Sequence, residues 1–377
     1  MRIVPSAPRF ASPSSQPWEE GQGGEYPSIT GLAQHGLCGA KRHPDASFMG
    51  RTRGGKRYNF RMARFLHRVR LENYKSIAHC DVELKDLTFL VGPNGAGKSN
   101  FLSSLYFLFL FPDLNPNSTI EWESIAKRHS ERTEIFFMTE YGDISTTKNT
   151  IDNVQNSYSN LETEALLKFR IINFSLKTDE FKEPKPSKKF RFLKTNGGNI
   201  VNILYAMQNE NKTNFNKVKS YLKNIAPCIH DLSIIQAGGY DILQFHEIDN
   251  DVPFNGSQVS DGTLHALGVL TALFHAKSAN ASLITIEEPE AGLHPAAARV
   301  LREALMEASE EVQIIVTSHS PDLLDSPDID PDSILAVVRE NGETKIGPID
   351  AASRKNLSEH LFTAGELLRM NQLEPAA

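Results

Sequence analysis

Apolar runs and alternating apolar and polar positions set the expected elements in the first half of the chain. Phe65–Leu71 and His79–Leu84 alternate between apolar and polar side chains, which predicts two half-buried strands. Leu87–Val91 is a continuous apolar run, typical of a buried strand, and a helix-like stretch follows to Phe111. Further strands are expected at Glu134–Tyr141, Leu166–Phe174 and Tyr240–Phe245.

The second half alternates apolar helices with short apolar strands. Lys212–Ile225 carries apolar residues at helical spacing and ends before Pro227, and Leu264–Phe274 is a strongly apolar helix. The strands expected after it are Leu283–Ile286, Val312–Thr317 and Ile334–Val338. Strand–helix–strand alternation predicts a parallel sheet covered by helices, and hence an α/β fold.

Length and composition exclude several classes of protein. The chain has 377 residues, 40% hydrophobic and 23% charged, as in an ordinary globular protein. Its longest apolar run, Phe101–Phe111, is far shorter than the roughly 20 residues of a membrane-spanning helix, so no membrane association is expected. Cys38, Cys80 and Cys228 are scattered and form no CxxC pair, which favours neither a disulfide framework nor a zinc site and indicates a reducing, cytoplasmic location.

Charge is distributed unevenly. The net charge is −6, yet residues 1–70 hold 12 Lys and Arg against 4 Asp and Glu, and the remainder holds 28 against 42. A basic arm could bind nucleic acid or an anionic membrane. Residues 1–61 are rich in Gly, Pro and Ser without apolar periodicity, and Met62 directly precedes the first patterned segment. A disordered extension upstream of the folded protein is therefore the preferred interpretation.

A glycine-rich loop follows the predicted strand Leu87–Val91. Residues 92–99 (GPNGAGKS) fit the phosphate-binding pattern GxxxxGK[ST], between a strand and a helix as that motif requires. Small residues let backbone N–H groups face one oxyanion at a positive helix terminus, the lysine adds a cation, and the serine hydroxyl can bind Mg²⁺. The residues expected at the nucleotide are Gly92, Pro93, Asn94, Gly95, Ala96, Gly97, Lys98, Ser99 and Asn100.

Acidic and histidine side chains follow two later predicted strands. Leu283–Ile286 runs into Glu287 and Glu288, so that Glu287 could hold Mg²⁺ through water and Glu288 could deprotonate an attacking water. An exposed acidic turn is the alternative. His319 closes Val312–Thr317 and could donate a hydrogen bond to the γ-phosphate, although it is one of 12 histidines and could be a polar loop residue. The chain contains neither a GxSxG elbow nor an HExxH helix, which argues against the corresponding hydrolases.

A third segment, VSDGT, directly precedes the apolar helix Leu264–Phe274. Ser260 or Asp261 is a good helix N-cap, and this structural role would explain the segment without any ligand. The functional interpretation is that Ser260 and the Gly262 amide face an anion at the positive helix end. The chain's own loop already occupies one side of a nucleotide, so that anion would belong to a second subunit.

Together these motifs resemble the ATPase head of the ABC class, in its RecF/SMC/OLD-like branch. The matching segments are LENYKSI with VGPNGAGKSN, VSDGT in place of a transporter's LSGGQ, IEEPEAGLHP, VTSHSPDLLD and the closing GELLRM of Gly365–Met370. The resemblance covers roughly residues 64–370. It implies an α/β P-loop NTPase fold of the ABC-ATPase head type, a mixed sheet with flanking helices and a helical and β insertion lobe.

The resemblance also implies roles for individual residues. ATP would be the bound nucleotide, with Glu288 as general base, His319 as switch histidine, and Ser99 and Glu287 at Mg²⁺. Ser260 and Gly262 would cap the γ-phosphate of a partner, so the chain would form a homodimer when ATP binds. Two departures stand out. Glu287 replaces the more usual aspartate, and no Q-loop glutamine can be assigned after Thr133.

The expected domain organisation follows from the position of the motifs. Residues 62–370 form the ATPase head, with 62–111 and 240–350 as nucleotide-binding core and 112–239 as an inserted lobe, and 371–377 form a tail. The lobe lacks an SMC-type coiled coil, and its basic and aromatic segment Lys182–Lys194 could contact DNA or be a solvated loop. Only 58 residues follow His319, too few for an OLD-type nuclease domain of about 100 or more.

Three functions compete. The leading hypothesis is an ATP-hydrolysing, nucleotide-gated dimer acting on DNA in RecF-like repair, although the acidity of residues 71–377 argues mildly against extended DNA contact. The second is the regulatory ATPase of an anti-phage defence pair with a separately encoded effector protein. A transporter subunit is the least favoured, because of the VSDGT signature and the missing membrane segment.

Overall fold

The fold is described from a computed structural model. It describes residues 65–110, 132–139, 142–149, 154–159, 171–174, 176–248 and 250–376, all within one unit of the chain, residues 59–377. The predicted extension 1–61, Phe111 at the end of the predicted helix, residues 166–170 of one predicted strand and residues 140–141 of another lie outside the described residues.

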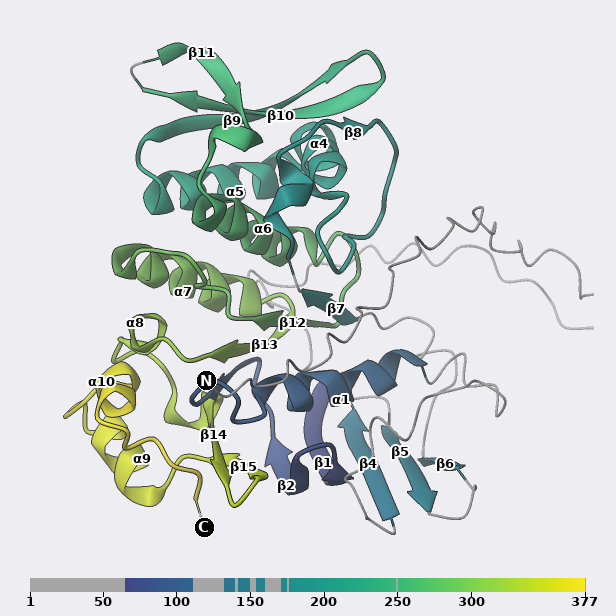
Figure 1. The fold of residues 1–377 in the computed structure, drawn as a ribbon, viewed down its shortest axis with the longest axis vertical. Helices are drawn as coiled ribbons and strands as arrows, with labels where there is room; N and C mark the ends of the chain where they lie inside the picture. Colours follow the sequence, from purple (N-terminus) through teal and green to yellow (C-terminus); the bar gives the residue numbers. More distant parts are fainter. Residues whose placement is uncertain are drawn as a thin grey trace, which may run out of the picture. The chain divides into compact units, whose positions relative to one another are not determined.

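An eleven-stranded mixed sheet runs through the described part of the chain (Figure 1). Its strands are β1 (Leu66–Tyr74), β2 (Ile77–Glu83), β3 (Leu87–Val91), β4 (Arg132–Thr139), β5 (Gly142–Asn149), β6 (Val154–Ser159), β7 (Ile171–Phe174), β12 (Leu283–Glu287), β13 (Gln313–Ser318), β14 (Ile334–Glu340) and β15 (Glu343–Pro348). From edge to edge their order is β6-β5-β4-β1-β2-β15-β14-β3-β13-β12-β7.

Five neighbouring strands, β14, β3, β13, β12 and β7, run parallel to one another. All side chains of β13 and the last four of β3 are buried, as expected where helices cover both faces of a parallel sheet. The register sets Val91 beside Ser318 and Thr317 beside Glu287. The carboxyl ends of β3, β13 and β12 therefore meet at one edge of the sheet, which is where ligands bind in such folds.

At the other end of the sheet, the five strands β6, β5, β4, β1 and β2 are antiparallel to one another where they pair, and β15 pairs with β2 in parallel. β1 pairs with both β2 and β4, and β5 lies between β4 and β6. Along β4, buried side chains such as Ile135 and Phe137 alternate with more exposed ones, the period expected when one face of a strand packs on a core. Phe101 and Leu105 of the helix that follows β3 belong to the same apolar cluster.

A second sheet and eight α-helices complete the described structure. The four-stranded sheet consists of β8 (Lys185–Pro186), β9 (Ile229–Ala237), β10 (Tyr240–Glu247) and β11 (Asn250–Asn255), with β10 paired to the other three. The helices are α1 (Lys98–Leu110), α4 (Ile200–Glu210), α5 (Lys212–Ile225), α6 (Asp261–His275), α7 (Pro295–Ser309), α8 (Pro321–Leu324), α9 (Ala351–Ser358) and α10 (Ala364–Arg369). Short 3₁₀ turns are η2 (Thr178–Phe181), η3 (Gly256–Gln258) and η4 (Pro331–Ser333).

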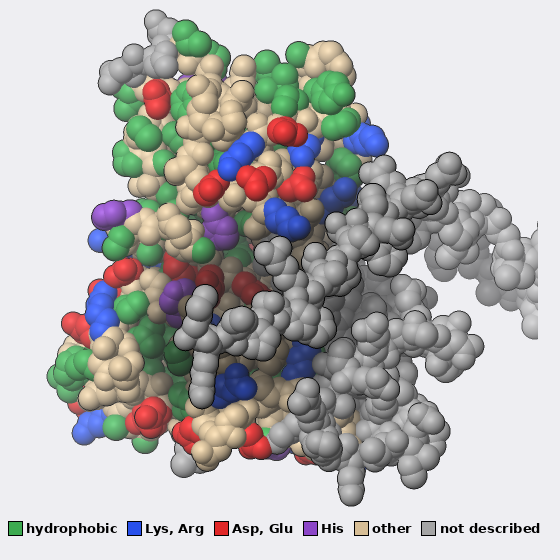
Figure 2. Space-filling model, viewed as in Figure 1, with side chains coloured by type: hydrophobic (Ala, Val, Ile, Leu, Met, Phe, Trp, Pro, Cys, Tyr) green, Lys and Arg blue, Asp and Glu red, His purple; other side chains and the backbone are tan. Residues whose placement is uncertain are grey.

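Acidic and basic side chains are interspersed on the surface of the described residues. Figure 2 shows Lys and Arg beside Asp and Glu on the face in view, without a continuous basic stripe among the described residues. Several of these charges are paired. Lys182 lies 2.8 Å from Asp261, and Lys185 lies 2.8 Å from Glu180.

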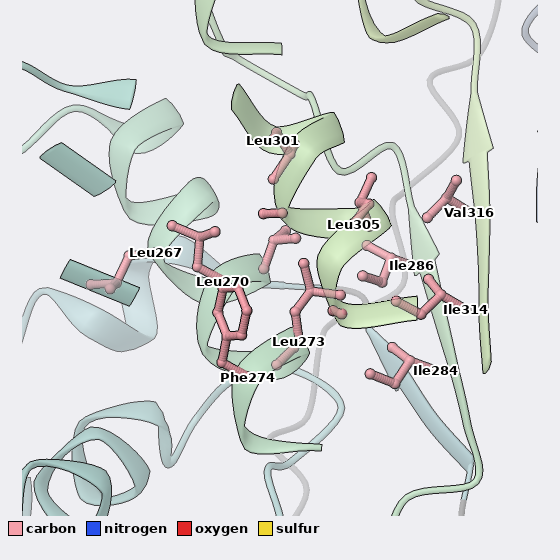
Figure 3. Close-up of a cluster of buried hydrophobic side chains, with 14 of the residues drawn as sticks. Leu267, Leu270, Leu273, Phe274, Ile284, Ile286, Leu301, Leu305, Ile314 and Val316 are labelled. Carbon is pink, nitrogen blue, oxygen red and sulfur yellow. The ribbon is translucent and has the colours of Figure 1, made fainter. Parts of the chain in front are cut away.

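Helix α6 lies at the centre of the larger apolar core. Figure 3 shows its Leu270, Leu273 and Phe274 in one apolar cluster with Leu301 and Leu305 of α7 and with apolar side chains of β12 and β13. Nearly every residue of α6 is buried, since α4 and α5 also pack against it. A helix that is apolar all round is stable only in such a setting. α6 thus joins the parallel sheet to the helices of the smaller sheet.

The predicted α/β architecture, with a mixed sheet, flanking helices and a helical and β lobe, is confirmed. Helix α5 coincides with the predicted Lys212–Ile225, and β3, β12, β13 and β14 occupy the predicted apolar runs. The predicted boundaries of the inserted lobe, at residues 111 and 240, do not coincide with the division of the strands between the two sheets. The strands β4 to β7 join the large sheet and β10 and β11 join the small one, because strand pairing follows contacts distant in sequence.

Candidate functional site

The glycine-rich loop connects β3 to α1 and packs tightly against β14 and β15. A Cβ on Gly92 would lie 2.0 Å from the Val337 carbonyl oxygen. Gly97 has φ +113°, and a Cβ there would lie 2.2 Å from Oγ1 of Thr344. Thr344 donates from that hydroxyl to the Ala96 carbonyl at 2.7 Å. Glycine is therefore required at both positions, and it leaves the loop backbone open toward the sheet edge.

Lys98, at the start of α1, is almost fully buried, with 6% of its surface exposed. Its Nζ donates to the carbonyls of Gly92 at 2.8 Å and Pro93 at 3.1 Å. Burial lowers the pKa of the Lys98 ammonium, and the carboxylates of Glu288, Glu290 and Glu287 oppose that shift. The cation is thus held at the loop by weak backbone acceptors, and a stronger anion could draw it away.

Ser99 and Glu287 meet across the end of the sheet. The Ser99 hydroxyl donates to Oε2 of Glu287 at 3.2 Å, although the two residues are 188 positions apart. Both side chains are hard oxygen donors, the kind that Mg²⁺ prefers. The amide of Asn100, the next residue, donates to the Ser76 hydroxyl at 2.7 Å.

Glu288 has an unusual backbone conformation, with φ +45° directly before Pro289. Its N–H donates to the Thr317 carbonyl at 3.0 Å, and its own carbonyl lies 3.3 Å from Nε2 of His265 on α6. Such strain in a non-glycine residue persists only where its surroundings fix it, and it often occurs at functional sites. The Glu288 side chain is partly exposed at the sheet edge.

His319 follows β13 and lies beside Glu288. Its Nδ1 is 3.1 Å from Oε1 of Glu288. The preceding Ser318 is fully buried and donates to Oε1 of Glu290 at 2.5 Å, and the Ser320 N–H donates to the Ser318 hydroxyl at 3.0 Å. Burial raises the pKa of the Glu290 carboxyl, whose Oε2 has no hydrogen-bond partner among the described residues.

The glycine-rich loop, the start of α1 and Glu288 line a cavity of about 460 Å³. Its lining consists of Asn94, Gly95, Gly97, Lys98, Ser99, Asn100, Glu288, Thr317 and Arg339. Arg339 was not expected from the sequence; it donates to the Gly95 carbonyl at 3.3 Å. The signal that could have found it is its position directly after the predicted strand Ile334–Val338, at the same edge as the other strand ends.

Ser260 and Gly262 are not among the residues lining this cavity. Ser260 is exposed and caps α6, accepting from the Thr263 N–H at 3.3 Å. Gly262 is buried against the loop that follows Glu288, where a Cβ would lie 2.1 Å from the Gly292 carbonyl oxygen. The structure thus brings the loop, Glu287, Glu288 and His319 together through the contacts above, although Glu287 and His319, like Ser260 and Gly262, do not line the cavity itself.

The basic and aromatic segment Lys182–Lys194 is partly folded into the protein. Lys182 pairs with Asp179 and Asp261, and Lys185 pairs with Glu180. Phe190 and Phe192 pack against the apolar core, and Lys188 and Lys189 are exposed. Within the described ranges, no helix is long and apolar enough to cross a membrane, and no group of three or more His, Cys, Asp or Glu forms a metal site.

A glycine-rich loop between a parallel strand and a helix, with acidic residues at the neighbouring strand end, defines the fold class as a P-loop NTPase. Comparison with solved structures shows that the fold is similar to that of SMC heads. The Smc head bound to the C-winged helix domain of ScpA matches with TM-score 0.56 and 14% identity over 78% of this chain and 99% of that one. The SMC head domain from Thermotoga maritima matches with TM-score 0.50 and 16% identity over 76% and 100%.

A third structure, the Smc head domain with an extended coiled coil bound to the C-terminal domain of ScpA from Pyrococcus furiosus, matches with TM-score 0.53 and 12% identity over 79% and 99%. Two family models match parts of the chain: "AAA ATPase domain" at residues 65–230 and "AAA domain, putative AbiEii toxin, Type IV TA system" at 155–325. No curated protein matches significantly. Parts of the chain thus resemble AAA ATPase domains, and its fold is that of SMC heads, which confirms the resemblance to the ABC-class RecF and SMC branch at the level of the fold.

Proposed function

We propose that this chain binds and hydrolyses ATP at the carboxyl edge of its large sheet, as one half of a head-to-head dimer. The observation that carries the proposal is the cavity of about 460 Å³ around the glycine-rich loop, Lys98 and Glu288. Pockets of this size accommodate small ligands such as nucleotides.

The loop suits a triphosphate because its glycines keep the backbone clear at the positive end of α1. Lys98 would exchange its two carbonyl acceptors for phosphate oxygens, which are stronger acceptors for an ammonium group. Arg339, which lines the same cavity, would add a second cation near the nucleotide. Gly92 to Asn100 would then enclose the phosphates.

Ser99 and Glu287 fit Mg²⁺, since they bring a hydroxyl and a carboxylate within 3.2 Å of each other. Mg²⁺ usually keeps waters and takes only one or two protein ligands beside the substrate's phosphates, so no larger acidic cage is needed. When bound, the ion would neutralise charge on the phosphate oxygens. Glutamate at position 287 would serve in place of the aspartate more usual in this class.

Glu288 would accept the proton of the attacking water, and His319 would orient its carboxylate. Support comes from the 3.1 Å contact between His319 Nδ1 and Glu288 Oε1 and from the strained backbone that holds Glu288 in place. A carboxylate that is partly exposed, with one oriented hydrogen-bond partner, retains lone pairs for a water molecule. His319 would also respond to loss of the γ-phosphate.

Dimerisation would complete the site. Ser260 and Gly262 lie at the positive N-terminus of α6 but outside the chain's own cavity, so their anion would come from a second copy. We infer that two heads face each other, with the Ser260 side of one against the glycine-rich loop of the other.

The cellular role we propose is DNA maintenance or repair in the cytoplasm. Likeness to SMC heads and the exposed Lys188 and Lys189 support it, and the mixed charges in Figure 2 predict modest DNA affinity. A second candidate is a regulatory ATPase of a defence system with a separate effector protein. One matching family is described as a putative AbiEii toxin of a type IV system, and this favours the second candidate.

Purified full-length protein tests the proposal. Hydrolysis of ATP and an ATP-dependent doubling of mass in light scattering are expected, and Ser260→Arg should bind ATP yet stay monomeric. A protein that stays monomeric and inactive at saturating ATP contradicts the proposal. ATP-dependent DNA binding that weakens steeply with salt would favour the DNA role, because phosphate contacts release counterions. Binding that ignores DNA would favour the effector role.

A further inference from the structure

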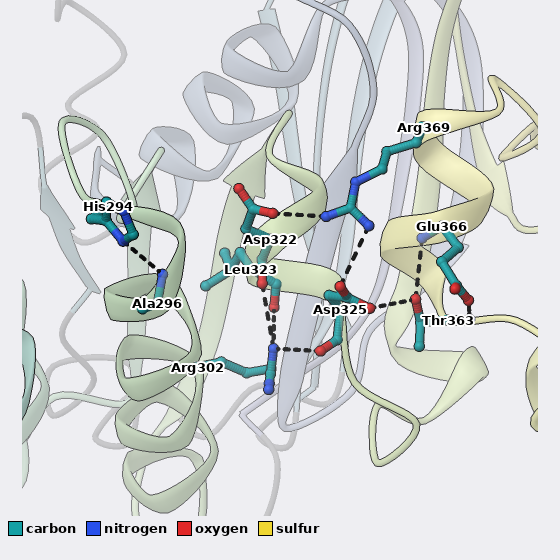
Figure 4. Close-up of polar contacts among 9 residues, drawn as sticks. All are labelled: His294, Ala296, Arg302, Asp322, Leu323, Asp325, Thr363, Glu366 and Arg369. Carbon is teal, nitrogen blue, oxygen red and sulfur yellow. Dashed lines mark hydrogen bonds and ion pairs between the residues drawn. The ribbon is translucent and has the colours of Figure 1, made fainter.

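The four-residue helix α8 begins two residues after His319 and is held by side chains from two other helices (Figure 4). From α7, the Arg302 guanidinium, only 5% exposed, donates from Nη1 to the carbonyls of Leu323 at 3.2 Å and Asp325 at 3.1 Å. The last carbonyls of a helix lack partners within the helix, so this buried cation satisfies them. α8 is therefore fixed at its C-terminal end.

The second attachment comes from α10, in the closing GELLRM segment that the ATPase site does not use. Arg369 lies 2.7 Å from Oδ1 of Asp322 through Nη2, and 3.4 Å from Oδ2 of Asp325 through Nη1. The Thr363 hydroxyl donates to the other carboxylate oxygen of Asp325 at 2.7 Å. Arg369 thus bridges both ends of α8, a geometry suited to the planar guanidinium.

Gly365 brings the two helices into backbone contact. A Cβ at this position would lie 2.3 Å from the Pro321 carbonyl oxygen and 3.1 Å from Cα of Asp325. Pro321 is the first residue of α8, and its ring restricts the backbone there. The closing segment therefore fits directly against the turn that carries His319.

The residues on both sides of His319 are fixed in position by their contacts. Ser318 is buried at the end of β13 and bonded to Glu290, and Pro321 begins the held helix α8. A helix of four residues is too short to be stable alone, so its position depends on these tertiary contacts. A shift of α8 would tilt His319 and alter its 3.1 Å contact with Glu288.

We propose that Arg369 is a positioning residue for ATP hydrolysis, which holds α8 so that His319 reaches Glu288. The proposal rests on the proposed function of the Glu288 and His319 pair. It gives the closing segment of the chain a role in turnover, although Arg369 touches none of the residues that line the cavity.

A double-mutant cycle on the full chain tests it. Arg369→Ala should lower kcat by about tenfold to a hundredfold, the usual effect of misplacing a reacting group, with an unchanged KM for ATP because the glycine-rich loop is untouched. Arg369→Lys keeps one charged contact and should recover part of the loss. In the His319→Ala background, Arg369→Ala should change kcat by less than about twofold, because both changes remove the same contact.

Lys277→Ala is the matched control. Lys277 forms a comparable exposed ion pair with Glu311 at 2.9 Å, away from the cavity, and its loss should leave kcat unchanged. An unchanged kcat in Arg369→Ala, or an equal loss with and without His319, would overturn the proposal. If the wild-type chain does not hydrolyse ATP, the proposed function fails, and hydrogen exchange of residues 317–326 still decides the inference. Arg369→Ala should speed that exchange by about tenfold, and equal exchange refutes it.

Discussion

Glu288→Gln separates proton acceptance from every other role of this side chain. The amide has the shape of the carboxylate, and it can keep a hydrogen bond to His319 Nδ1, now 3.1 Å from Oε1. The backbone of Glu288 is held by Thr317 and His265, so the substitution should not move it. Nucleotide binding by the loop and Lys98 should therefore persist.

The expected loss follows from the one function that glutamine lacks. A positioned general base contributes about 10²–10⁴-fold. That factor corresponds to about 3–5 kcal/mol in activation free energy. The partial exposure of Glu288 makes solvent a weak substitute, so we expect slow residual hydrolysis instead of none.

Single-turnover hydrolysis of ATP, measured together with ATP affinity, is the assay. Glu290→Gln is the matched control, because burial raises the pKa of Glu290 and favours its neutral form, which glutamine imitates. That variant should keep near-normal turnover. Normal turnover in Glu288→Gln, or equal losses in both variants, would show that another group accepts the proton.

Three further predictions concern binding, stability and the N-terminal segment. Lys98→Ala should abolish detectable ATP binding in calorimetry while the protein stays folded, because it removes the ammonium group that lines the cavity at the glycine-rich loop. Leu270→Ala, in the α6 core, should lower the free energy of unfolding by about 2–5 kcal/mol and lower the melting temperature in scanning calorimetry. Deleting residues 1–61 should leave ATPase activity intact, and lost activity would refute the prediction of a disordered extension.

The sequence predicted best those elements whose signal is local. The apolar runs of β3, β12 and β13 are buried on both faces, so composition alone indicated them. Helix α4 was not predicted, although its buried residues Ile200, Ile203, Leu204 and Met207 have helical spacing. The strands β5 and β6 are rich in polar residues, so they lack the apolar pattern that indicates a strand. They form because β5 pairs with both β4 and β6, and the pattern of a single sequence does not reveal such pairing.

The site also contains residues that a local motif predicts and residues that only the assembled fold brings in. The glycine-rich loop and the glutamates at the end of β12 belong to contiguous motifs and could be read directly from the sequence. Arg339 and His265 were missed, because each contact depends on how distant elements assemble. Arg339 donates to the Gly95 carbonyl although the two residues are 244 positions apart in the sequence, and His265 contacts the Glu288 carbonyl from helix α6. Order of strands in a sheet, more than residue type, decides such neighbours.

One helix connects the two surfaces on which the proposed dimer depends. The N-terminus of α6 carries Ser260, and one turn further His265 contacts the Glu288 carbonyl at 3.3 Å. Gly262 packs so closely on Gly292 that a side chain there would meet its carbonyl at 2.1 Å. A partner nucleotide that binds at this terminus would therefore affect the position of the segment from Glu288 to Gly292, which carries the proposed general base Glu288. A closely packed interior transmits small displacements instead of absorbing them. Hydrolysis in the pocket of one subunit should therefore depend on whether the partner subunit's nucleotide is bound at the α6 terminus of that same subunit.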